Sequence, residues 1–239
     1  MQSIYFVDSN FTYESSKKSI LSIRYATDGF SFCVHDETGK LVVFVHEPYA
    51  ADSREAAVAR LKNYVVNDAI LNLRFKKVYI MPCFKEKLLV PGAFFDKANI
   101  TTLYTVNQEV SPDDTILYHH IEGIEAYLVE TVISSFHDFV REHFPVFQIV
   151  NGAYPFILGA MGKALRDTEQ IFLDIQDNYF DLLFIRDSGI QLFNTFSYKA
   201  TTDIVYFLLN CIKECGINQE KAHLSICGPA LKDNKLKEL

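Results

Sequence analysis

A pattern of alternating apolar residues that leads into a glycine turn occurs twice in this chain, with a spacing of 150 residues. The aligned apolar positions are Phe30, Phe32 and Val34 in the first copy and Phe180, Leu182 and Phe184 in the second. Gly39 and Gly189 align as the glycines of the two turns. Apolar residues at every second position, bounded by a turn, predict a β-hairpin. We therefore interpret the repeat as an internal duplication of one supersecondary unit.

A helix and a buried strand follow the hairpin in both copies. In the first copy, Asp52 and Glu55 have the spacing of a capping box ahead of an amphipathic stretch, and the strand is predicted at Val78–Met81. In the second copy the apolar stripe of the helix has the spacing of one helical face: Ile204, Phe207, Leu208, Cys211, Ile212 and Cys215. Gly216 is placed to end that helix, and His223–Ile226 is predicted as the last strand.

The residues between the two copies form a further block of strands and helices. Strands are predicted at Ile116–His120, Ala126–Val129 and Val146–Val150, one helix face at Val132, Ile133, Phe136, Phe139 and Val140, and a second helix at Pro155–Leu165. Strands that alternate with helices indicate an α/β protein with mixed sheets flanked by helices.

Charge and composition exclude several classes of protein. The 239-residue chain has a formal net charge of -7, and without a basic stripe it is predicted not to bind nucleic acid. No apolar run is long enough for direct insertion into a membrane. The N-terminus lacks the pattern of a signal peptide, and five cysteines, an odd number, fit a reducing compartment. We therefore expect a cytoplasmic protein.

The two hairpin–helix–strand units resemble the paired ribonuclease-H-like lobes of the actin-like ATPase superfamily. The order of elements from Ile116 to Arg166 is similar to the middle of the actin-like assembly proteins of type IV pili and type II secretion. The chain as a whole, including the segment Leu89–Phe95, resembles a bacterial family of unknown function from Bacteroidetes that has this fold. The resemblance implies an N-terminal lobe at 1–167 with an inserted strand–helix block, and a C-terminal lobe at 168–239 that is interpreted as incomplete.

The resemblance also implies where ATP and Mg²⁺ would bind. In active members the turn of each hairpin holds phosphate through glycine N–H groups, and an aspartate at the strand end serves the metal ion. In the second copy Asp174 and Asp181 bracket the corresponding turn as expected. Gln176, Asp177 and Asn178 replace the glycines, so side chains stand where phosphate oxygens would approach, and Asp177 adds like-charge repulsion.

The first copy departs further from the superfamily pattern. Arg24 aligns with Asp174, and arginine can pair with phosphate but cannot ligate Mg²⁺. After the last strand, Gly228 matches one of the two glycines that contact adenosine, but Pro229 stands in place of the other. No cofactor is therefore expected. If a nucleotide does bind, the residues expected to hold it are Asp174, Asp177 and Gly228.

Other arrangements of chemically active residues favour ordinary structural roles. Cys211 and Cys215 lie on the apolar stripe of a helix, which indicates core packing rather than a metal site. His119 and His120 are adjacent on a strand and so point to opposite faces. A Cys–His pair with Cys83 or Cys227 as nucleophile stays open.

Two surface features complete the sequence-based expectations. Phe94 and Phe95 would form a docking patch if exposed, although buried packing is the usual state of such a pair. The segment Lys232–Leu239 is predicted to be a solvated surface helix.

Three functions follow from these observations. The first is a non-catalytic binding or scaffold protein, a pseudo-ATPase that acts through a protein partner or through self-association. The second is a divergent ATP-binding protein or ATPase of the actin and sugar-kinase superfamily, with an open cleft between the lobes. The third, a nuclease, is ranked last because the first copy has no acidic residue on its leading strand.

Overall fold

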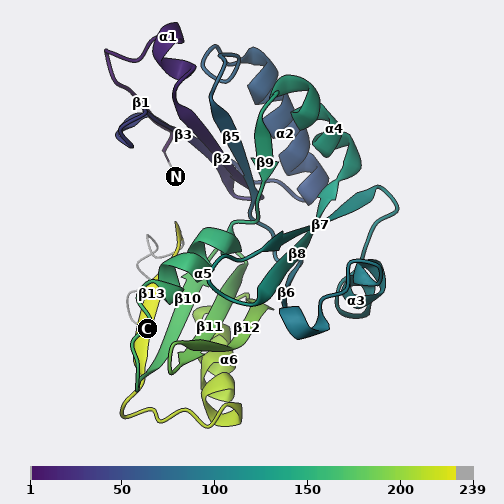
Figure 1. Ribbon diagram of the computed structural model, residues 1–239, viewed down its shortest axis with the longest axis vertical. Coiled ribbons are helices and arrows are strands. Elements are labelled where there is room, and N and C mark those ends of the chain that lie inside the picture. Colours follow the sequence, from purple (N-terminus) through teal and green to yellow (C-terminus); the bar gives the residue numbers. More distant parts are fainter. Residues whose placement is uncertain (1, 230–239) are drawn as a thin grey trace. The chain divides into compact units, whose positions relative to one another are not determined.

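The computed structural model describes residues 2–229, so the helix predicted at Lys232–Leu239 lies outside the described residues. The chain divides into two compact units (Figure 1). Unit 1 comprises Met1–Glu86, Asp96–His119 and Leu128–Gly152, and unit 2 comprises Lys87–Phe95, His120–Tyr127 and Ala153–Leu239. These units are defined by compactness. The predicted division into lobes at 1–167 and 168–239 stays a prediction.

Unit 1 is built on a six-stranded sheet in the order β1-β4-β3-β2-β5-β9. Its strands are β1 (Ile4–Val7), β2 (Ile20–Ala26), β3 (Gly29–His35), β4 (Leu41–Pro48), β5 (Lys77–Pro82) and β9 (Phe147–Ile149). Its helices are α1 (Tyr13–Ser16), α2 (Arg54–Asn67), α3 (Ile100–Asn107) and α4 (Ser134–His143). Helices α2 and α4 lie side by side on one face of the sheet (Figure 1). Their apolar side chains and the facing residues of β2–β5 form the core of unit 1.

Unit 2 is built on a four-stranded sheet in the order β12-β11-β10-β13. Its strands are β10 (Glu169–Ile175), β11 (Tyr179–Arg186), β12 (Gly189–Ser197) and β13 (His223–Cys227), and its helices are α5 (Ala153–Met161) and α6 (Thr201–Glu214). Helix α6 covers the face formed by Phe180, Leu182 and Phe184, each of which is fully buried. Burial of each such side chain contributes about 1.5–3 kcal/mol to folding.

A third, three-stranded sheet has the order β6-β8-β7. Its strands are β6 (Lys87–Pro91), β7 (Asp114–His120) and β8 (Ala126–Ile133), and the short 3₁₀ helix η1 (Gly92–Phe94) follows β6. The predicted mixed α/β class with sheets flanked by helices is thus confirmed.

The two larger sheets repeat one topology. In each, an antiparallel meander of three strands is followed by a helix and by a strand parallel to the first: β2–β3–β4–α2–β5 in unit 1 and β10–β11–β12–α6–β13 in unit 2. A β-bulge interrupts β3–β4 between Val34 and His35 and interrupts β11–β12 between Phe184 and Ile185. The bulges are separated by the same 150 residues as the sequence repeat. Because a bulge is a local feature that families conserve, this match supports our interpretation of a duplication.

Several local predictions were correct and others were wrong. Gly216, with a φ of 60°, follows the C-cap of α6 as predicted. Ser53, rather than Asp52, caps α2, because the Ser53 hydroxyl accepts a hydrogen bond from the N–H of Ala56. Val132 and Ile133 belong to β8 and not to a helix, because a run of β-branched residues favours extended backbone.

The prediction for the aromatic pair Phe94–Phe95, at the end of η1, was also wrong in part. Phe94 is 74% exposed, against the expectation of buried packing. Phe95 stacks on Tyr127, with 3.7 Å between ring centroids. Tyr127 of β8 thus covers the ring of Phe95, whereas most of Phe94 is open to solvent.

None of the helices in the described part of the chain is long and apolar enough to cross a membrane.

Candidate functional site

The candidate site lies at the carboxyl end of β10 in unit 2, where the sequence places the altered phosphate turn. Asp174 is directly opposite Asp181 of β11 and beside Cys227 of β13 in the strand register. Residues that are opposite in register point to the same face of a sheet, so the three side chains share one face. This is the face away from α6, whose core residues occupy the alternate positions.

Gln176 binds the carboxylate of Asp174. The Nε2 amide of Gln176 donates a hydrogen bond of 2.9 Å to Oδ1 of Asp174, and only 7% of Gln176 is exposed. The backbone of Gln176 is also fixed, because its carbonyl accepts a 2.6 Å hydrogen bond from the hydroxyl of Tyr198. Gln176, at the position where the resemblance implies a phosphate-binding glycine, therefore occupies the space next to Asp174.

Asp177 and Asn178 form the exposed tip of the β10–β11 turn. The carbonyl of Asn178 accepts a hydrogen bond from the N–H of Tyr198, which ties the tip to the chain after β12. Asp174 is half-buried below this tip, whereas Asp177 is exposed on it. The two aspartates of the predicted nucleotide-binding set therefore lie in different environments.

Gly228 lies against Asp174. Its φ is 117°, a backbone conformation that side chains strongly disfavour. A Cβ at this position would lie 2.6 Å from the backbone nitrogen of Ile175 and 2.8 Å from Oδ1 of Asp174. Close backbone packing, as well as the φ angle, therefore requires glycine here. The structure thus brings together Asp174 and Gly228.

A buried ion pair holds Asp181, the second aspartate of the motif. The Nζ of Lys87 lies 2.8 Å from Oδ1 of Asp181, and the two side chains are 1% and 3% exposed. The hydroxyl of Thr195 donates a 2.7 Å hydrogen bond to the same oxygen. The ammonium group also lies 4.6 Å from the centroid of the Tyr179 ring, at cation–π distance. Lys87 was not predicted as a site residue, although a lysine directly ahead of the apolar run Leu88–Val90 was a visible signal.

Cys227 is a protonated thiol at neutral pH. Its Sγ lies 3.9 Å from Oδ1 of Asp174. Burial, followed by the charge of Asp174 and the hydrogen bond to it, raises the pKa of Cys227 to about 11. A nucleophilic cysteine needs a lowered pKa, so this environment opposes the Cys227 hypothesis.

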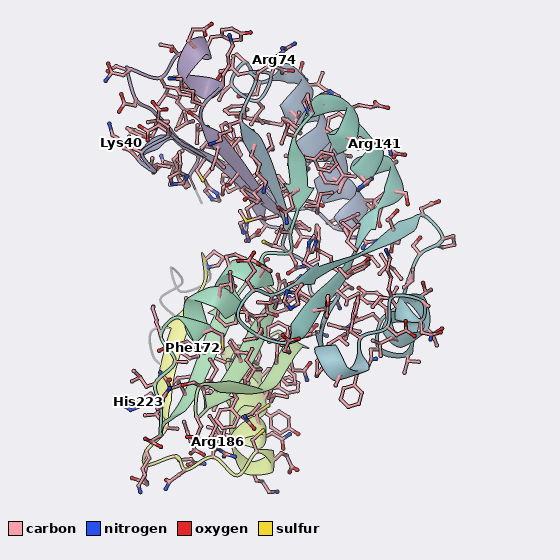
Figure 2. All side chains as sticks on the ribbon, viewed as in Figure 1. Lys40, Arg74, Arg141, Phe172, Arg186 and His223 are labelled. Atoms are coloured by element: carbon pink, nitrogen blue, oxygen red, sulfur yellow. The ribbon has the colours of Figure 1, made fainter. Side chains whose placement is uncertain are left out.

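An apolar cavity adjoins Cys227 within unit 2. Its volume is about 260 Å³, and it lies between α5 and the edge of the sheet formed by β10 and β13. Its lining residues are Pro155, Phe156, Gly159, Ala160, Lys163, Phe172, Ser225, Ile226 and Cys227. Phe172 of β10 and His223 at the start of β13 mark this edge of the sheet in Figure 2.

The corresponding position of unit 1 has the opposite charge. Arg24 of β2 is opposite Ser31 of β3, and its guanidinium lies 3.3 Å from a carboxylate oxygen of Asp28 in the same hairpin. The two side chains are 22% and 12% exposed. The arginine that aligns with Asp174 is therefore paired within its own hairpin turn.

A second buried polar group, this one in unit 1, was also not predicted from the sequence. Glu130 of β8 is 1% exposed, and its Oε2 accepts a 2.9 Å hydrogen bond from Nδ2 of Asn151. Nε2 of His119 lies 3.8 Å from the other carboxylate oxygen, and burial lowers the pKa of His119. A glutamate within an apolar strand was the only sequence signal for this group.

Among residues 2–229, no group of His, Cys, Asp and Glu side chains is placed to hold a metal ion. Cys211 is buried in the core of unit 2, and Cys215 packs against that core, as predicted.

Comparison with known proteins gives the family and the fold. The family described as "Protein of unknown function (DUF3822)" matches residues 8–239. No curated protein matches the chain. A Bacteroides thetaiotaomicron protein with an actin-like ATPase fold and unknown function is similar in structure, with a TM-score of 0.87 and 23% identity over 95% of this chain and 89% of that protein.

More distant structures include the PilM–PilN type IV pilus biogenesis complex, with a TM-score of 0.47 and 13% identity over 83% of this chain and 66% of that one. An exopolyphosphatase from Cytophaga hutchinsonii has a TM-score of 0.42 and 11% identity over 90% of this chain and 68% of that one. The similarity to the Bacteroides protein confirms the actin-like ATPase fold predicted from the repeat. The match over residues 8–239 establishes that this chain belongs to the DUF3822 family.

Proposed function

We propose that this protein is a non-catalytic binding or scaffold protein whose nucleotide site has degenerated on an actin-like fold. The observation that carries the proposal is the hydrogen bond from Gln176 to Asp174. In a working site of this kind, glycine N–H groups would face a phosphate and the aspartate would face Mg²⁺ and water. Here a buried side chain takes the place of one of those glycines and binds the aspartate.

The charges around the turn support the same proposal. Lys87 compensates Asp181 inside unit 2, so this lysine serves the fold and is not exposed to an anion. Asp177 adds a negative charge at the exposed tip, where a triphosphate would have to approach. Repulsion between like charges, together with the loss of the glycine N–H groups, opposes phosphate binding.

A protein that has this fold but does not hydrolyse ATP would act by binding a partner on its surface. We place it in the cytoplasm, where its five cysteines, none of them in a disulfide, are stable as thiols. The expected partner is another protein or a second copy of this chain.

Thermal unfolding with and without nucleotide tests the proposal. A ligand at 100 times its Kd stabilises a protein by about 2.7 kcal/mol, which raises Tm by several degrees. We expect no change in Tm with about 1 mM Mg-ATP or Mg-ADP, a concentration that would reveal a Kd near 10 µM. A rise of several degrees that is lost in Asp174→Ala would overturn the proposal.

The adjacency of Asp174 and Gly228 favours one alternative, a divergent ATP-binding protein. In that case the nucleotide would displace Gln176 from Asp174. Gln176→Gly would then strengthen the rise in Tm with Mg-ATP, because it restores the glycine and frees the carboxylate. Under the scaffold proposal, Gln176→Gly lowers Tm and leaves it independent of nucleotide.

A further inference from the structure

The first strand of unit 1 has an unusual edge. In the order of the six-stranded sheet β1 is the outermost strand, and its Ile4, Tyr5 and Phe6 are 43%, 66% and 45% exposed. Successive residues of a strand point to opposite faces, so both faces of this edge present apolar side chains. Natural edge strands are usually protected from pairing by short length, lysine, proline, a bulge or a cover, and β1 is short, with four residues. The sequence Ile4–Val7 contains no charge or proline, and its register with β4 is regular.

The backbone of β1 offers hydrogen-bonding groups at this edge. The N–H of Asp8 donates a 2.8 Å hydrogen bond to the carbonyl of Val42 and so continues the ladder between β1 and β4. Alternate residues of an antiparallel strand bond to the same neighbour. Phe6, two residues before Asp8, therefore faces β4, whereas Tyr5 and Val7 direct their N–H and C=O groups to the outer edge.

We infer that β1 pairs in antiparallel fashion with β1 of a second copy of this chain. One register uses all of the outward groups: Tyr5 pairs with Val7 of the second copy, and Val7 with its Tyr5. Phe6 then meets Phe6 of the second copy on the two-fold axis. Such an interface is isologous, with the same surface contributed by both copies.

The side chains of β1 complement themselves in this register. Tyr5 opposite Val7 is an aromatic–β-branched pair, and Phe6 opposite itself is an aromatic pair, both of which stabilise sheets. Ile4 would lie opposite Asp8, whose carboxylate is 2.7 Å from the ammonium of Lys40. Lys40, at the β1 end of unit 1 in Figure 2, therefore neutralises the only charge in the paired segment.

The exposed apolar area of β1 limits the affinity expected for the dimer. The exposed parts of Ile4, Tyr5 and Phe6 amount to roughly 300 Å² per copy, since an aromatic side chain buries about 150–250 Å² in full. A stable interface buries about 800 Å² per partner. The contact is therefore reversible, and we expect a Kd of tens to hundreds of micromolar.

This inference rests on the proposed function, because it names the surface and the partner through which a scaffold would act. Its experiment uses no nucleotide, so a failure here leaves the nucleotide result unchanged.

Sedimentation of the full-length chain over a range of concentrations tests the pairing. We expect monomers at about 1 µM and a substantial fraction of dimers at about 500 µM. Phe6→Lys should abolish the dimer, because it places two like charges together on the two-fold axis. Leu224→Lys is the matched control: Leu224 is 46% exposed and lies on β13, the edge strand of the other large sheet. A protein that stays monomeric at 500 µM, or a dimer that survives Phe6→Lys, would overturn the inference.

A cross-link tests the register and does not depend on the stability of the lysine variant. Directly opposed residues of a non-hydrogen-bonded pair have Cα atoms about 4.5 Å apart, within the range of a disulfide. Phe6→Cys should therefore form an intermolecular disulfide on mild oxidation, whereas Tyr5→Cys, which lies opposite Val7, should form much less. The wild-type chain with its five cysteines gives the background. Equal cross-linking of the two variants would contradict the register.

Discussion

The β2–β3 hairpin of unit 1 and the β10–β11 hairpin of unit 2 have the same backbone and opposite chemistry. Each is the start of a meander with a bulge at the matching position. Arg24 of the first hairpin pairs with Asp28 near the surface, whereas Asp174 of the second binds Gln176 and its neighbour Asp181 is buried with Lys87. The apolar positions that build the core are alike in both hairpins, while the polar positions at the strand ends differ.

The two strands that lie beside these hairpins, β5 and β13, also differ in the residue at their carboxyl end. Pro82 ends β5 beside Tyr25, and Gly228 follows β13 beside Ile175, the matching residue of the second hairpin. Proline fixes φ and glycine frees it, so the two sites tolerate different backbones.

The largest expected effect comes from breaking the buried ion pair of the second hairpin. Lys87→Met leaves the carboxylate of Asp181 buried without its cation, and we expect the free energy of unfolding to fall by about 3–5 kcal/mol in urea titration. Lys40→Met is the control, because Lys40 pairs with Asp8 at the surface, where solvent screens the two charges, and its loss should cost far less. The double variant Lys87→Met/Asp181→Leu should recover most of the loss. Equal costs for Lys87→Met and Lys40→Met would show that the buried pair does not stabilise unit 2.

The next effect concerns the strand ends. Gly228→Ala should lower the free energy of unfolding by about 2–4 kcal/mol, because the new Cβ meets the backbone of Ile175 and the φ of 117° strains any side chain. Pro82→Ala, at the matching position of unit 1, should change stability by less than about 1 kcal/mol. Thermal or urea unfolding of both variants measures the difference. Similar values for the two variants would mean that the two strand ends pack alike.

A smaller effect is expected for the thiol beside Asp174. The pKa of Cys227, about 11 in the folded chain against an ordinary value of 9.0, leaves little thiolate at pH 8.5. Asp174→Asn removes the charge that raises this pKa, so alkylation of Cys227 by iodoacetamide should become severalfold faster, as measured by mass spectrometry. Cys215, which is not beside Asp174, serves as the internal control. An unchanged rate at Cys227 would mean that burial alone sets its pKa.

The same pKa has a consequence for stability. Because the folded value lies above the ordinary one, the folded chain holds the proton more tightly. The stabilisation from this thiol is fully present below about pH 9 and is lost as the pH rises from 9 to 11. The free energy of unfolding of the wild type should therefore fall relative to that of Cys227→Ser over this range, while parallel pH profiles would count against the effect.

The smallest effect is expected in the first hairpin. Arg24→Ala removes a long, partly exposed ion pair with Asp28, and the cost should stay below about 1 kcal/mol. The contrast with Lys87→Met measures how far the two hairpins have diverged. A loss above 2 kcal/mol would make the polar groups of both hairpins equally structural.

The sequence predicted the scaffold well because apolar periodicity is a local signal. The alternation over Phe180–Phe184, the stripe of α6 and the glycine at its C-terminus each depend on residues close in the chain. The errors arose where neighbouring residues favour different local structures. Ser53 caps α2 in place of Asp52, and a run of β-branched residues extends β8 where a helix was predicted.

The candidate site was predictable only in part. The sequence identified Asp174 and Gly228 and the missing glycines between Asp174 and Asp181. It gave no means to pair Lys87 with Asp181, because these two residues are far apart in the chain, nor His119 with Glu130, because the register of β7 against β8 decides which of their side chains meet. Which charge meets which depends on how distant strands are brought together.

The turn between Asp174 and Asp181 illustrates the difference between what the sequence determined and what the tertiary structure decided. The sequence alone determined that one unit is present twice, since spacing needs no tertiary contact, and its resemblance to the actin-like ATPase superfamily implied that this turn lacks phosphate-binding glycines. Only the tertiary structure decided what replaced them: Gln176 bound to Asp174, a lysine buried against Asp181, and an apolar β1 left at the edge of a sheet. Burial and pairing depend on what lies within a few ångströms in space, and the order of residues along the chain does not specify that.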